Sequence, residues 1–272
     1  MPAAEKRRRK KELSRQRREE ALKRYRARRR RRSAITLGVV GAITAALFVL
    51  IAQARREPQQ EQQQVEGCTD EEPQREEVGP FEEPPMTLDE SKEYFATIET
   101  SCGTIEARLV AQVSPKTVNS FAFLAGEGFY DGLTFHRIAR DSVVQGGDPN
   151  GDGSGDPGYS ITEPPPPGAE YPLGALAMAR GPNDPPGASG SQFFIVSGPQ
   201  GAQLNGNAEF PAQYAVLGIV TEGFETLERL NSVETFTPPD SNEKATPRTP
   251  VYILKITVSE RSPTPSPSPS PG

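Results

Sequence analysis

Three stretches decide the fold: FHRIARDSVVQGGDPNGDGSGDPGY at residues 135–159, GALAMARGPNDPPGASGSQFFIV at 174–196 and YAVLGIVTEGFETLERL at 214–230. Each contains short apolar runs that are bounded by Gly and Pro. Such runs are typical of β-strands separated by turns, and they are too short for most helices. The centre of the chain therefore predicts a mainly β domain.

Alternating residues extend this pattern toward both ends of the chain. YFATIE at 94–99 and TIEARL at 104–109 alternate apolar and polar positions around Cys102-Gly103, which predicts a β-hairpin. The run VYILKI at 251–256 predicts a last strand. These outer strands delimit one globular domain at residues 92–258.

Two short helices are predicted between the strands. Ser114-Pro115 supplies an N-cap and a proline at the first helical position, and Gly126 ends the first helix. Helical spacing is seen at Val118, Phe121 and Leu124 in the first helix and at Phe224, Leu227 and Leu230 in the second. Because strands outnumber helices, a barrel or a sandwich is favoured.

The charge of the chain is divided unevenly. The 272 residues carry a net charge of −5 and have a mean hydropathy of −0.59. Residues 1–32 nevertheless hold 17 of the 31 Lys and Arg residues and only four of the 36 acidic residues. Twenty uncharged residues follow, SAITLGVVGAITAALFVLIA at 33–52. At 1.5 Å per residue they span about 30 Å, the thickness of the hydrocarbon core of a bilayer, so residues 33–54 predict a transmembrane helix.

This charge division also predicts a topology. A strongly basic flank stays in the cytoplasm, so residues 1–32 are predicted to be cytoplasmic and the rest extracytoplasmic, in a single-pass protein of the cell membrane. A cleaved signal peptide is the alternative, because Ala52-Gln53-Ala54 resembles a cleavage site. A nucleic-acid partner is not predicted, since the only aromatic residue among the basic ones is Tyr25.

Two further segments are predicted to lie outside any core. Residues 55–91 are rich in Gln, Glu and Pro without a helical or strand period, which predicts an extended linker. Residues 259–272 contain the Pro/Ser repeat PTPSPSPSPSPG, which predicts a disordered tail.

Several kinds of site are excluded or disfavoured by the composition. One histidine, His136, and two cysteines exclude zinc sites of the Cys₂His₂ or Cys₄ type. Residues 148–156 follow most of the residue order of a calcium loop, but Tyr159 stands where the bidentate Glu belongs. No metal site and no cofactor are predicted.

Together the three central stretches strongly resemble the cyclophilin family of peptidyl-prolyl cis-trans isomerases. The matching sequence motifs are FHR, VQGGDP, the strand with Met178-Ala179, GSQFFI, and an aromatic residue before VLG. The resemblance implies a closed eight-stranded antiparallel barrel capped by two helices. It implies proline-containing polypeptides as partners, and an anchored domain that assists the folding of exported proteins.

The resemblance also assigns the site residues. Isomerisation of an X-Pro bond requires stabilisation of a twisted imide nitrogen and a dry pocket for the proline ring, without a nucleophile or a metal. Arg137 is implied as the cation that donates to this nitrogen, with Gln145 as its catalytic partner. The implied substrate-binding residues are Val143, Met178, Ala179, Arg180, Gln192, Phe194, Leu204 and Tyr214. His136 is predicted to be structural.

Departures from the family pattern keep a second function open. Ser142 stands where a Phe is usual, and Tyr214 replaces the usual His. Gln203 stands where many members have Trp, which weighs against tight binding of cyclosporin. The alternative is a non-catalytic cyclophilin scaffold that acts as a chaperone or peptide-binding module.

The two thiols, Cys68 and Cys102, both lie on the predicted outer side of the membrane, where disulfides persist. Cys102 is predicted at the exposed tip of the first hairpin, within reach of a flexible linker. An intramolecular disulfide is favoured, with a bond between two chains and free thiols as alternatives.

Overall fold

The computed structural model describes residues 65–205, 212–239 and 241–261. These residues belong to one compact unit that begins at Gln62. The strands are β1 Glu93–Thr100, β2 Gly103–Leu109, β3 Arg137–Ala139, β4 Val143–Gly146, β5 Ile161–Thr162, β6 Ala175–Met178, β7 Ala188–Ser189, β8 Phe193–Val196, β9 Val216–Glu222, β10 Thr235–Phe236, β11 Thr246–Pro247 and β12 Ile253–Arg261. The helices are α2 Pro115–Gly126, the 3₁₀ helix η1 Pro199–Leu204 and α3 Phe224–Ser232. The mainly β class and the two predicted α-helices are confirmed.

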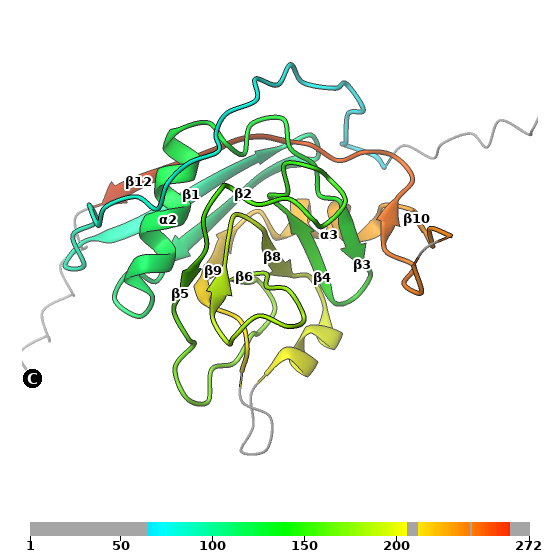
Figure 1. Cartoon of the computed structure of the whole chain (residues 1–272). Coiled ribbons are helices and arrows are strands. Elements are labelled where there is room, and N and C mark those ends of the chain that lie inside the picture. Colours follow the sequence, from blue (N-terminus) through cyan, green and yellow to red (C-terminus); the bar gives the residue numbers. More distant parts are fainter. Residues whose placement is uncertain (1–64, 206–211, 240, 262–272) are drawn as a thin grey trace, which may run out of the picture. The chain divides into compact units, whose positions relative to one another are not determined.

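Eight strands form one curled antiparallel sheet in the order β12-β1-β2-β9-β6-β8-β4-β3 (Figure 1). The prediction of a closed barrel is wrong, because no ladder joins the two edge strands β3 and β12. The segment just before β3 spans this gap instead, through the isolated bridge Thr134↔Tyr252. Backbone hydrogen bonds flank the bridge, from the Phe135 amide to the Val251 carbonyl at 2.9 Å and from the Ile253 amide to the Leu133 carbonyl at 2.7 Å. β3 has three residues, and its Ile138 amide donates to the carbonyl of Ala245, in the loop before β11, instead of to β12. The sheet is therefore not closed by a ladder between β3 and β12.

The sheet packs apolar side chains on both of its faces. Successive residues of a strand point to opposite faces, so neighbouring positions join different clusters. Val144 and Ile195 join the main core together with helix residues such as Phe121. Val143 and Phe194 join a second, smaller cluster. The second cluster is the part of the fold on which the candidate site is built.

The chain before β1 departs from the predicted free linker. Residues 65–91, which we call the strap, have no helix or strand but pack along the domain (Figure 1, cyan). The side chain of Asn119 on α2 accepts hydrogen bonds from the backbone amides of Thr87 (2.9 Å) and Leu88 (3.3 Å). The ring of Phe81 packs edge-on against Phe123, with 5.3 Å between their centroids. These contacts make the strap part of the folded domain.

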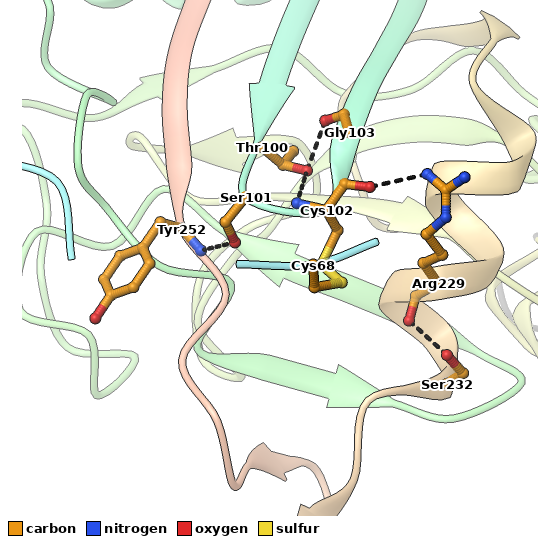
Figure 2. Close-up of a disulfide and its surroundings, with 8 residues drawn as sticks. All are labelled: Cys68, Thr100, Ser101, Cys102, Gly103, Arg229, Ser232 and Tyr252. Atoms are coloured by element: carbon orange, nitrogen blue, oxygen red, sulfur yellow. Dashed lines mark hydrogen bonds between the residues drawn. A yellow bond between two sulfur atoms is a disulfide. The ribbon is translucent and has the colours of Figure 1, made fainter. Parts of the chain in front are cut away.

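A disulfide joins the strap to the first hairpin. The sulfurs of Cys68 and Cys102 lie 2.02 Å apart (Figure 2). Cys102 is fully buried, so the expectation of an exposed hairpin tip is wrong. The tip is covered because the backbone amide of Thr69 donates to the Ser101 carbonyl and Arg229 of α3 donates to the Cys102 carbonyl.

The predicted membrane segment at 33–54 and the basic segment at 1–32 lie outside the described residues, as does the predicted tail from residue 262 onward. The start of the predicted tail, at 259–261, is wrong, because these residues pair with β1 as the end of β12. Among the residues that the structure describes, no helix has the length and apolar character needed to cross a bilayer.

Candidate functional site

Four adjacent strands bring distant residues into one row on the face of the second cluster. Arg137 of β3 is paired with Gln145 of β4, Gln145 with Phe194 of β8, and Phe194 with Ala177 of β6. Directly opposed residues on neighbouring strands share a face, with Cβ atoms about 4.5–5.5 Å apart. Strand register therefore places a cation, an amide and an aromatic ring side by side.

A chain of hydrogen bonds fixes the polar half of this row. Arg137 Nη1 donates to Gln145 Oε1 at 3.3 Å, and Gln145 Nε2 donates to Gln192 Oε1 at 3.0 Å. Gln192 Nε2 in turn donates to the carbonyls of Gly153 and Gly155, both at 3.0 Å. The three predicted polar residues are thus brought together, and their chain ends on the backbone of a loop.

A fourth polar residue, Glu243, belongs to the same site. Its carboxylate accepts hydrogen bonds from Arg137 Nε at 2.8 Å and from Nη2 at 2.7 Å. Glu243 was not predicted from the sequence, because it lies 106 residues from Arg137 in the loop between β10 and β11 and belongs to no motif.

The apolar half of the site is made by the second cluster. Phe194 packs edge-on against Tyr214 with 5.1 Å between ring centroids, and Val143 is buried in the same cluster. Tyr171 supports Tyr214 from behind: its hydroxyl donates to the Tyr214 carbonyl at 2.6 Å and accepts from the Tyr214 amide at 3.2 Å. Burial raises the pKa of Tyr171 to about 12, so this hydroxyl keeps its proton at neutral pH. The half-buried Leu204 and Ala179 pack on the rim of the cluster.

One predicted substrate-binding residue, Met178, is placed differently from the expectation, and another, Arg180, also bonds to the backbone of its own loop. Met178 is 1% exposed in the main core, so its predicted contact with a peptide is wrong. Strand alternation is the reason, because Ala177 and Ala179 point to the site and Met178 points the other way. Arg180 Nη1 donates to the carbonyls of Gly181 (2.8 Å) and Asp184 (2.6 Å), so its side chain organises the loop after β6.

A cavity of about 720 Å³ lies beside this polar chain. Gln145 and Gln192 line one part of it, the loop around Gly153–Gly155 lines another, and Arg180 and Asp184 line a third. It offers room for residues of a bound peptide next to the row of site residues.

The loop at residues 148–156, which resembles a calcium-binding loop in sequence, has a structural role in this fold. The buried carboxylate of Asp148 accepts hydrogen bonds from the backbone amides of Asn150, Gly153 and Gly155. These hydrogen bonds fix the position of the Gly153 and Gly155 carbonyls, which accept hydrogen bonds from Gln192 Nε2. Within the described ranges, no group of three or more His, Cys, Asp or Glu side chains is arranged to hold a metal ion.

His136 is half-buried beside Arg137 and has no direct part in the row. Burial lowers the pKa of His136 below its ordinary value of 6.5, although the charge of Asp148 opposes this shift. Its Nδ1 atom is buried without a hydrogen-bond partner in the described part of the chain. The structure thus favours the neutral imidazole.

A pH dependence of stability follows from this burial. Below about pH 6.5 the unfolded chain takes up a proton at His136 more readily than the folded chain, so the free energy of unfolding is expected to fall. Denaturant unfolding between about pH 7.5 and pH 5 measures this fall in the free energy of unfolding. The neutral variant His136→Gln is the control. The wild-type curve should fall more steeply than the variant's below about pH 6.5, and parallel curves would contradict the assignment.

Chemically, the site offers a permanent cation at the edge of a buried apolar wall that contains Phe194 and Val143. Arginine stays protonated and presents its donors in a fixed plane. Such a donor can stabilise a pyramidal imide nitrogen, and an apolar wall of this kind can receive a proline ring.

Comparison with known proteins leads to the same chemistry. Residues 95–258 match the family model described as cyclophilin type peptidyl-prolyl cis-trans isomerase/CLD. The chain is 46% identical over 131 residues to peptidyl-prolyl cis-trans isomerase B of Bacillus subtilis, covering 47% of this chain and 83% of that protein. It is 36% identical over 151 residues to a probable peptidyl-prolyl cis-trans isomerase B of Mycobacterium tuberculosis, covering 48% of this chain and 44% of that protein.

A solved structure shows the same fold. The cyclophilin-type isomerase of Cryptosporidium parvum, crystallised in the presence of the dipeptide Ala-Pro, superposes with a TM-score of 0.50 at 27% identity. The match covers 61% of this chain and 99% of that one. The family match covers most of the described residues, and the curled sheet and the row around Arg137 agree with it. The chain therefore belongs to the cyclophilin-type peptidyl-prolyl cis-trans isomerases.

Proposed function

We propose that this chain accelerates cis–trans isomerisation of X-Pro bonds in exported proteins, from a domain held outside the cell membrane by residues 33–54. The observation that carries the catalytic part is the placement of the Arg137 guanidinium in one strand row with Phe194. Rotation about an X-Pro bond faces a barrier of about 18–20 kcal/mol, because the amide resonance must be broken. Each 1.4 kcal/mol of stabilisation gained in the twisted state raises the rate about tenfold.

Individual residues of the site have distinct roles in this mechanism. The proline ring lies against Phe194, Val143 and Tyr214, which exclude water from the reacting bond. Arg137 donates to the imide nitrogen as its lone pair becomes localised. Gln145 and Gln192 are within reach of the peptide backbone because they line the adjoining cavity. No proton is transferred, so His136 has no catalytic role.

Proline peptides as ligands are supported by the similar Cryptosporidium isomerase, whose crystals were obtained in the presence of Ala-Pro. Exchange spectroscopy by NMR on a peptide with one Ala-Pro bond tests the proposal with the full chain in detergent micelles. Catalysis predicts faster cis–trans exchange at substoichiometric protein. Peptide binding without faster exchange would instead support the non-catalytic scaffold.

The topology is supported by the charge division of the sequence, with 17 Lys and Arg residues before residue 33. Protease added to spheroplasts is expected to cut the segment after the membrane helix and to release the domain, which immunoblotting detects. Lysed spheroplasts and a cytoplasmic marker protein are the controls. A domain that stays protected until lysis would place it in the cytoplasm and overturn the topology.

A further inference from the structure

We infer that Glu243 is a positioning residue for isomerisation: it holds the Arg137 guanidinium in the orientation that the X-Pro imide requires. This inference rests on the proposed catalytic function and adds a residue that lies outside the motifs of the site. Its carboxylate binds Arg137 through both oxygens, at 2.7 and 2.8 Å. Paired bonds of this kind fix the plane of a guanidinium as well as its position.

The geometry indicates that Glu243 orients the Arg137 guanidinium and does not block its contact with a substrate. A guanidinium has five N–H donors. Glu243 takes one from Nε and one from Nη2, and Gln145 takes one from Nη1. In the described part of the chain, the remaining N–H bonds, one on each Nη nitrogen, have no acceptor. Two fixed partners thus leave donors on both Nη nitrogens for a substrate.

The loop that carries Glu243 is itself anchored beside β3. The Ile138 amide donates to the Ala245 carbonyl at 2.7 Å, directly after Arg137 in the chain. The Glu243 amide donates to the hydroxyl of Ser241 at 3.1 Å, and the Thr235 hydroxyl donates to the Lys244 carbonyl at 3.2 Å. The carboxylate is therefore presented by a backbone that is bonded on both sides of it.

Pre-organisation of this kind should act on turnover more than on binding. A long arginine side chain loses rotational freedom when it engages a substrate, and an existing clamp removes part of that loss before the reaction. Because the pair is partly exposed, with side-chain exposures of 33% for Arg137 and 48% for Glu243, its direct effect on stability is small.

The test compares three variants of the full chain in the NMR exchange assay. Glu243→Ala is expected to lower kcat/KM about tenfold, equivalent to about 1.4 kcal/mol, mainly through kcat. Glu243→Gln keeps the length and one acceptor, so it should recover to within roughly threefold of wild type. Glu234→Ala is the matched control, since it removes a partly exposed ion pair to Arg248 with an N–O distance of 2.9 Å. This pair flanks strands β10 and β11, whose connecting loop carries Glu243. The control should leave kcat/KM unchanged.

A second readout does not depend on turnover. The Nε–H proton of Arg137, which Glu243 binds, should exchange slowly with water in wild type and in Glu234→Ala, but rapidly in Glu243→Ala. Unchanged kcat/KM together with unchanged exchange in Glu243→Ala would overturn the inference. Higher activity in both Glu243 variants would also overturn it, because Glu243 would then mask Arg137. If wild type itself shows no turnover, the proposed function fails, whereas the Nε–H exchange still decides whether Glu243 holds Arg137.

Discussion

Replacing Arg137 with alanine is expected to lower kcat/KM for an Ala-Pro peptide by roughly 10²–10³-fold, the effect of removing one preorganised donor from a developing charge. The fold should survive, because the side chain is one-third exposed and its ion pair with Glu243 contributes less than about 1 kcal/mol. NMR exchange spectroscopy gives the rate, and denaturant unfolding gives the stability of the same sample.

Arg248→Ala is the matched control for this prediction. Arg248 also pairs with a glutamate, Glu234, and its side chain is 39% exposed, but it has no place in the strand row. The control should lose no activity. Turnover of Arg137→Ala within about twofold of wild type would refute the role of this cation, and a large loss of unfolding free energy would show that its role is structural.

Loss of the Cys68–Cys102 disulfide is expected to lower the free energy of unfolding by about 4 kcal/mol on the chain-entropy model, since the bond closes a loop of 34 residues in sequence separation. The full effect is expected because the strap is ordered by folding through contacts such as Phe81 against Phe123. The variant Cys68→Ala with Cys102→Ala removes the bond without placing a hydroxyl in the buried site of Cys102.

Denaturant unfolding with and without a thiol reductant measures this effect. Reductant should lower the midpoint of the wild type to that of the double variant and should leave the variant unmoved. Equal midpoints for wild type and variant without reductant would contradict the prediction. Peptide mapping under non-reducing conditions should also yield a cross-linked peptide that contains both cysteines.

The sequence predicted the parts of the fold that depend on local pattern. The hairpin around Cys102 follows from alternation, and the helix after Ser114 follows from helical spacing and the proline at its start. The predicted cap is wrong in one respect: the Ser114 side chain makes no capping hydrogen bond, and the carboxylate of Glu163 accepts from the first amides of α2. Recognisable sequence motifs contain Arg137, Gln145 and Gln192, which is why the sequence predicts them as site residues. Strand register then brings them together. Local signals are sufficient for such features.

Other features depend on contacts that local pattern does not encode. Glu243 reaches the site only because the loop before β11 folds back onto β3. No ladder closes the barrel between its edge strands, because β3 bonds to Ala245 before β11 and only the segment that precedes β3 reaches Val251 and Ile253. The strap is held by a few separated apolar residues, among them Val78 and Phe81, which have no regular spacing in the sequence. Met178 lies away from the site because alternation along its strand separates it from Ala177 and Ala179.

The strap also determines where this domain can be cut. A fragment that began at Lys92 would match the region predicted from strand pattern, but it would leave Cys102 as an unpaired thiol and uncover Phe123 and the Asn119 side chain. Such a fragment would tend to form dimers through oxidation of Cys102 and to aggregate through its exposed apolar surface. A fragment that retains the N-terminal boundary near Gln62 keeps all three contacts, so stability and activity measured on shorter fragments would describe a damaged domain.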